Sequence, residues 1–146
     1  STWAPDSVSS TIAYDAEIKN KVFSCTGTKE QKQVIFSVTL KNAGNTDGFT
    51  TGTYNVDDAG TTTMQFNTQQ KNDAGQYVFL PAGTVAPGSG TVNITAVDSV
   101  KKQITGTFYF YSRTTNYDDD GNVISITVHN ITSGAFNSLP YTTSTL

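Results

Sequence analysis

Apolar and polar residues alternate along several short segments of the chain, and this period of two is typical of β-strands. The clearest example is residues 34–40, whose apolar face is formed by Val34, Phe36, Val38 and Leu40. A second is residues 103–112, where one face carries Ile104, Phe108 and Phe110. Because these are the two strongest apolar faces in the chain, we expect them to pack against each other in one core.

Further strands are predicted between turns that are marked by Gly, Pro, Asn and Asp. They cover residues 13–26, 52–56, 61–68, 76–80, 92–96, 123–130 and 131–136. Roughly eight to ten short strands with no helical periodicity between them predict an antiparallel β-sandwich or a strongly curved β-barrel. The pattern does not separate these two architectures. We expect a single all-β domain over residues 1–146.

Two glycines interrupt strands that otherwise consist of large residues. Gly106 lies between Ile104 and Phe108, and Gly134 lies between Ile131 and Phe136. A glycine inside a strand indicates a bend or a close approach of the backbone to another group. Both positions are consistent with a strongly curved sheet.

Composition narrows the classes of function. The chain has 146 residues, a net charge of -3 and 14% charged residues, and no segment concentrates Lys or Arg. Binding to nucleic acid requires several cations that neutralise phosphates, so nucleic acid is not an expected partner. No apolar run approaches the roughly 18 to 20 residues of a membrane-spanning helix.

Cys25 is the only cysteine, which excludes an intrachain disulfide and a zinc finger. It follows Phe23 in a strand-like segment, so we expect a buried, unreactive thiol that packs as a small apolar group.

Four short motifs, in this order and spacing, are Gly52-Thr53-Tyr54, Gly90-Thr91-Val92-Asn93-Ile94-Thr95, Ile104-Thr105-Gly106-Thr107-Phe108-Tyr109-Phe110 and Ile131-Thr132-Ser133-Gly134-Ala135-Phe136-Asn137. Through these motifs the chain resembles an uncharacterised family of small Bacteroidetes envelope lipoproteins, which is classed as a domain of unknown function. The resemblance covers the chain from Trp3 to Tyr141. The resemblance implies an exported protein of the cell envelope, in the periplasm or at the outer-membrane surface, whose lipid anchor precedes this sequence. It implies no catalytic residues.

The loop that begins at Asn116 resembles the start of a calcium-binding loop, with oxygen ligands at alternate positions from Asn116, Asp118 and Asp120. Position twelve of such a loop is Thr127 instead of a bidentate Glu. We therefore expect a hairpin turn with positive φ at Asp120-Gly121. Calcium, the one cofactor considered, would bind weakly, in the 10⁻⁴ to 10⁻³ M range, and would order the loop without taking part in chemistry.

Aromatic residues that could form a stacking platform are the candidate ligand-binding groups: Tyr109, Tyr111, Tyr77 and Trp3. A flat aromatic surface matches the C–H face of a sugar ring. The alternative, which we favour at this stage, is that other elements cover these tyrosines and leave only their hydroxyl groups at the rim.

The sequence contains no recognisable catalytic motif. His129 is the only histidine, and Ser125 is predicted on the same strand face, but this pair is too little to define a hydrolase. We expect a non-enzymatic envelope domain that binds a glycan or a protein. The alternative is a lipocalin-like carrier, which requires an apolar cavity of roughly 300 Å³ or more.

Overall fold

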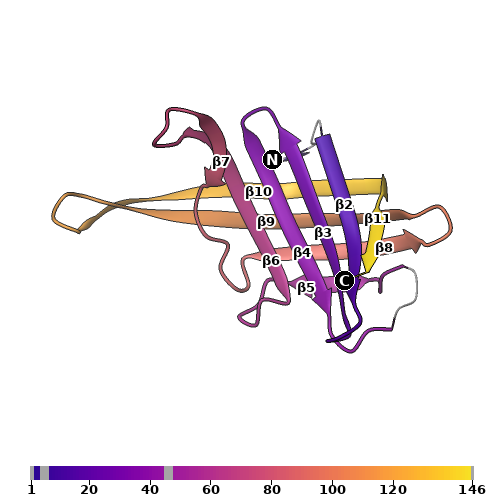
Figure 1. Cartoon of the computed structure of the whole chain (residues 1–146). Helices are drawn as coiled ribbons and strands as arrows, with labels where there is room; N and C mark the ends of the chain where they lie inside the picture. The colour runs from indigo at the N-terminus through magenta and orange to yellow at the C-terminus, as the bar shows by residue number, and fades with distance from the viewer. Residues whose placement is uncertain (1, 4–6, 45–47, 146) are drawn as a thin grey trace.

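Two β-sheets packed face to face form the fold in the computed structural model, which describes residues 2–3, 7–44 and 48–145 (Figure 1). These residues contain strands and turns and no helix. In chain order the strands are β1 (Thr2–Trp3), β2 (Ser7–Asp15), β3 (Asn20–Lys29), β4 (Lys32–Leu40), β5 (Gly52–Asn55), β6 (Thr62–Lys71), β7 (Tyr77–Pro81), β8 (Gly90–Asp98), β9 (Gln103–Tyr117), β10 (Val123–Pro140) and β11 (Thr142–Thr145).

The five-stranded sheet has the order β1-β10-β9-β8-β5, and the six-stranded sheet has the order β11-β2-β3-β4-β6-β7. The strands of one sheet run crosswise to those of the other, as in an orthogonal sandwich (Figure 1). In the described part of the chain, no hydrogen-bonded strand pair joins the two sheets. The all-β sandwich is thereby confirmed, and the closed-barrel alternative is not formed.

Both ends of the chain change sheets at the same side of the sandwich. β1 and β10 are neighbours in the five-stranded sheet, and the strands that follow them, β2 and β11, are neighbours in the other. Both pairs, β1 with β10 and β11 with β2, are parallel. The parallel pairs differ from the antiparallel pairing that the sequence predicts, and β1 and β11 were not predicted, because strands of two and four residues are too short to show a period.

The core lies between the sheets and is rich in phenylalanine. The rings of Phe36 in β4 and Phe108 in β9 pack at a centroid distance of 5.3 Å, and those of Phe66 and Phe110 at 6.2 Å. Ile104 is fully buried in the same cluster. The predicted packing of residues 34–40 against residues 103–112 is therefore confirmed.

Close approaches explain both strand glycines. A methyl group at Gly106 would overlap the carbonyl oxygen of Asn93 and the ring of Phe136. A methyl group at Gly134 would overlap the ring of Phe108. The expectation that the backbone comes close to another group at these two positions is confirmed, and glycine is the residue that allows both phenylalanine rings to reach the core.

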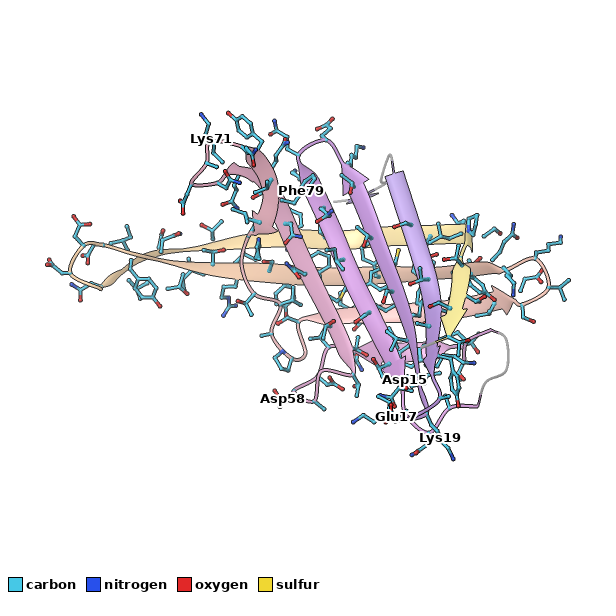
Figure 2. The ribbon with its side chains drawn as sticks, viewed as in Figure 1. Asp15, Glu17, Lys19, Asp58, Lys71 and Phe79 are labelled. Atoms are coloured by element: carbon cyan, nitrogen blue, oxygen red, sulfur yellow. The ribbon has the colours of Figure 1, made fainter. Side chains whose placement is uncertain are left out.

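The predicted single strand over residues 13–26 is wrong, because a turn separates β2 from β3. Asp15 Oδ1 accepts hydrogen bonds from the backbone N–H groups of Glu17 and Ile18, and Lys19 adopts a positive φ of 55°. Figure 2 shows Asp15, Glu17 and Lys19 together at this end of the sheet. Lysine rarely adopts this conformation, so the turn lacks the usual glycine signal.

Two other boundaries differ from the prediction. β3 continues through Gly27 to Lys29, and the turn that follows uses Glu30 with a φ of 55°. The two strands predicted over 123–136 are one strand, β10, which is interrupted by bulges between Ile131 and Gly134 and between Phe136 and Leu139. A bulge keeps the strand continuous while it shifts the register of the side chains.

Cys25 is buried, with 6% of its surface exposed. Burial raises the pKa of its thiol from 9.0 to about 12. Because the thiolate is the reactive form, the expected buried position is confirmed and the raised pKa supports an unreactive thiol.

Candidate binding surface

A long hairpin projects from the sandwich at the junction of β9 and β10, on the left of Figure 1. β8 pairs with β9 only as far as Phe110. Beyond it, Tyr111 N–H donates to the carbonyl oxygen of Ser89, and Arg113 forms an isolated bridge with Thr84. We call residues 111–130 the arm. Within the arm, β9 and β10 pair with each other, and the six-stranded sheet does not extend over its tip (Figure 1).

The outer face of the arm points away from the core. Ser112 is fully buried on the inner side, whereas its neighbour Tyr111 is exposed. Residues directly opposite each other in an antiparallel pair share a face. The register therefore places Val128 beside Arg113 and Ile126 beside Thr115 on the outer face.

Seven large apolar or aromatic side chains on this hairpin are between 39% and 64% exposed: Tyr109, Tyr111, Tyr117, Val123, Ile124, Ile126 and Val128. We call this set, together with Arg113, the outer patch. Large exposed apolar patches are uncommon on monomeric proteins and usually indicate a binding site, which makes this set the candidate binding surface.

The opposite face of the arm is polar, which reverses the usual pattern of a sandwich strand. The Asn116 side-chain amide donates hydrogen bonds to Ser125 Oγ and Thr127 Oγ1, each at 3.0 Å. Ser112 Oγ donates to the carbonyl oxygen of Ala82 at 3.0 Å. The apolar residues of the arm therefore lie on the solvent side of the hairpin, where their burial does not contribute to the core.

Asp118 closes the tip of the arm. Its Oδ1 accepts hydrogen bonds from the N–H groups of Asp120 and Asn122, both at 2.9 Å, and its carbonyl oxygen accepts one from Gly121. Gly121 has a φ of 84°. The predicted hairpin turn is confirmed, with the positive φ at glycine.

Weak calcium binding at this loop stays the alternative to a plain hairpin turn. In the part of the chain that the structure describes, no group of three or more Asp, Glu, His or Cys residues is arranged to hold a metal ion. Asn116, one of the three proposed ligands, directs its amide nitrogen to the neighbouring strand. Asp118 already uses one carboxylate oxygen within the turn.

The structure separates the candidate aromatic residues. Tyr109 and Tyr111 lie on the outer face of β9, and the expectation that other elements cover them is wrong, because 51% and 39% of their surface is exposed. Tyr77 lies in β7 of the other sheet, with Lys71 Nζ 5.7 Å from its ring centroid (Lys71 is labelled in Figure 2). It does not join the outer patch. The side chain of Trp3 lies outside the described residues.

Sequence reasoning missed the aliphatic part of the outer patch. Ile124, Ile126 and Val128 recur with a period of two, which predicts a strand but not which of its faces is exposed. The pairing of β10 with β9 has no register shift between Ser125 and Ile131, so ordinary alternation places Val128 on the outer face and Ile131 in the core. The period of two alone does not tell which of the two faces is covered.

The cavity between the two sheets gives little support to the alternative function of a lipocalin-like carrier. This cavity has a volume of about 210 Å³ and is lined mainly by apolar residues, among them Cys25, Phe36, Phe108, Phe136 and Leu139. It is smaller than the roughly 300 Å³ that a carrier of small molecules requires. A wider groove of about 410 Å³ beside Asp57 and Thr84 is open to solvent.

Asp57 has an ordered environment of its own. Its carboxylate accepts hydrogen bonds from the hydroxyl group and the backbone N–H of Thr61, and these hydrogen bonds, the one from the hydroxyl first, lower its pKa below the usual 3.8. This arrangement fixes the loop between β5 and β6. It provides no partner residue for acid–base chemistry.

The structure describes the side chain of only one member of the Ser125–His129 pair. The Ser125 hydroxyl accepts a hydrogen bond from Asn116, and the side chain of His129 lies outside what the structure describes. The class of protein that the fold and the outer patch define is a two-sheet β-sandwich with a projecting, apolar hairpin.

A family model described as a domain of unknown function (DUF6252) matches residues 7–140, and the chain belongs to this family. Comparison with curated proteins and with solved structures gives no match. No helix long and apolar enough to cross a membrane occurs among the described residues.

Proposed function

We propose that this domain is a non-enzymatic binding module of the cell envelope and that it binds a protein partner through the outer patch. The observation that carries the proposal is the exposure of Ile126 and Val128 on the same face of the arm as Tyr111 and Arg113. Tyrosine and arginine, surrounded by apolar residues, are the groups that contribute most to protein interfaces.

The aliphatic residues favour a protein over a glycan. Sugar rings stack on flat aromatic groups and are held by hydrogen bonds from polar side chains. Two tyrosines, Tyr109 and Tyr111, are adjacent on the outer face, but the patch continues into Ile126 and Val128. Branched aliphatic side chains gain free energy when an apolar partner surface covers them, at roughly 25 cal/mol per Å² of buried area.

The envelope location rests on the resemblance to exported lipoproteins and on the composition of the chain. Ser, Thr, Asn and Gly dominate the polar residues, charged residues make up 14%, and one buried cysteine leaves no exposed thiol among the described residues. These features suit an exported β-domain. The same resemblance supports the proposal of a lipid anchor ahead of the domain.

Site-specific photo-crosslinking in living cells tests the proposal. A photoreactive amino acid is placed at Ile126 on the outer patch, and the matched control is placed at Tyr77, which is 67% exposed on the other sheet. The proposal predicts a covalent adduct with a different protein from position 126 and none from position 77. Mass spectrometry identifies the adduct.

Adducts from both positions, or from neither, would contradict a protein-binding role for the outer patch. Retention of the domain on a glycan array, lost in Tyr111→Ala and kept in Val128→Ser, would favour the glycan alternative instead. An adduct that contains only a second copy of this chain would also contradict the proposed function.

A further inference from the structure

The arm exposes a hydrogen-bonding edge along β10. Among the described residues, β10 has no paired strand on its outer side before Ser133, where the two-residue β1 begins. We call residues 123–131 the β10 edge. This edge can pair with another strand only if the backbone N–H and C=O groups of some of its residues point away from β9.

The hydrogen bonds that β9 makes on its other side show how the backbone groups of β10 are directed. The N–H of Tyr111 donates to the carbonyl oxygen of Ser89 at 3.0 Å, and the N–H of Arg113 donates to that of Thr84 at 2.9 Å. Both groups therefore point away from β10. Their partners Asn130 and Val128 form non-hydrogen-bonded pairs with β9, so the N–H and C=O groups of Asn130 and Val128 point to the open side.

Backbone groups alternate in direction along a strand, so the N–H and C=O groups of Ile126, two residues from Val128, also point to the open side. The side chains of Ile126 and Val128 lie on the outer face, and their backbone donors and acceptors lie along the open edge. An exposed edge of this kind is a template for another strand.

Proteins usually protect such an edge with lysine, proline or a very short strand. The other edge strands follow this rule: β1 has two residues, β5 has four, and β7 ends at Pro81. The β10 edge has the sequence VISITVHNI, which contains no Lys, Arg, Asp, Glu or Pro. It combines high β-propensity with the absence of charge.

We infer that the β10 edge pairs with the same edge of a second copy of this chain, antiparallel across a two-fold axis. A two-fold axis brings identical segments together, so any charged residue near it faces its own like charge. The β10 edge carries none. This absence of charge favours a second copy over a peptide recognised by charge complementarity.

The direction of the backbone groups sets which residues form hydrogen-bonded pairs with a partner strand, and full overlap of the two β10 edges, residues 123–131, centres the two-fold axis on Thr127. Thr127 bonds to β9, so it forms a non-hydrogen-bonded pair with a partner strand, and the axis passes between Thr127 and the partner's Thr127. Ile126 then lies opposite the partner's Val128 on the outer face. Such cross-strand pairs of branched aliphatic residues stabilise a sheet.

The dimer is closed, because pairing of the two β10 edges occupies both of them. It leaves the outer faces uncovered, so the two outer patches lie side by side in one continuous sheet. Self-association is thus distinct from the proposed function, and purified protein without any partner tests it.

Sedimentation velocity over about 1 to 100 μM purified protein is the first measurement, at concentrations where a dimer of micromolar affinity dissociates on dilution. The wild type should form a dimer. Val128→Lys places two positive charges near the axis and should weaken dimerisation at least tenfold. Thr107→Lys is the matched control, because Thr107 is exposed on the same face of β9 but lies between β8 and β10.

A disulfide test reports the register and does not depend on Val128. Thr127→Cys should form a disulfide-linked dimer on mild oxidation, because facing residues in a non-hydrogen-bonded pair bring their Cβ atoms within bonding reach. Thr143→Cys, exposed on β11, should not. Cys25 is buried in both variants.

A wild-type monomer at 100 μM, a dimer that Val128→Lys leaves unchanged, or equal disulfide formation by both cysteine variants would overturn the inference. A ladder of oligomers above the dimer would also overturn it, because a closed two-fold contact stops at two copies. The thermal melting curve of each variant confirms that it is folded.

Discussion

The ring of Phe108 in the middle of β9 packs against the ring of Phe36 in β4, with their centroids 5.3 Å apart and their planes inclined at 43°. This contact joins the two sheets of the sandwich at the centre of the core. It also brings the Phe108 ring over Gly134, so one side chain connects β4, β9 and β10.

Replacement of Phe108 by alanine should lower the free energy of unfolding by about 3 to 5 kcal/mol, because it removes a buried ring and leaves a cavity. Chemical denaturation measures the change. Tyr109→Ala is the control. The ring of Tyr109, next to Phe108 in the sequence, is half exposed, and its removal should lower the free energy of unfolding by about 0.5 kcal/mol or less. Similar midpoints for the two variants would contradict the assignment of Phe108 to the core.

Gly134→Ala should be destabilising by about 1 to 3 kcal/mol, because the added methyl group overlaps the Phe108 ring. In a Phe108→Leu background the same substitution should cost less, and a double-mutant cycle measures this coupling. Gly44→Ala is the matched control, with no atom near the added methyl group and no positive φ. Purely additive effects in the cycle would show that the ring is not what excludes alanine.

The Cys25 thiol should react with thiol reagents only when the protein unfolds. With a pKa of about 12, roughly one thiol in 10⁴ is ionised at pH 8. The raised pKa also predicts how stability depends on pH. The contribution of the protonated Cys25 thiol to the free energy of unfolding is complete below pH 9 and is lost as the pH rises through about 12. Labelling of the native protein as fast as of the denatured protein would refute the buried, protonated thiol.

The Asp118 turn predicts that calcium leaves the stability of the domain unchanged. A ligand that binds only the folded state raises the melting temperature, and about 5 mM calcium would occupy most of a site with a dissociation constant of 10⁻³ M. Melting curves with and without calcium should coincide. A rise that Asp120→Asn abolishes would instead establish the weak calcium site.

The sequence was informative wherever one face of a strand is buried. Val34, Phe36 and Val38 repeat with a period of two because each alternate side chain faces the core, and the same holds for Ile104, Phe108 and Phe110. The strand glycines were predictable for a similar reason, since no other residue fits beneath a packed ring.

Turns without glycine were not predictable. Lys19 and Glu30 adopt positive φ values in the turns that flank β3, and neither residue type signals this conformation. The sequence also did not predict which face of the arm carries its apolar side chains. The register with β9 sets Val128 opposite Arg113 and so decides which side of the hairpin Ile126 and Val128 occupy, and this register depends on the pairing of the two strands rather than on local sequence.

The central claim is that the outer patch is the binding surface of this domain, and the most direct test is the affinity for the protein captured at Ile126. Isothermal titration should show that Tyr111→Ala weakens binding at least tenfold, as expected for an aromatic residue near the centre of an interface. Tyr77→Ala, on the other sheet, should bind like the wild type. Unchanged affinity of Tyr111→Ala, or an equal loss in Tyr77→Ala, would contradict the claim.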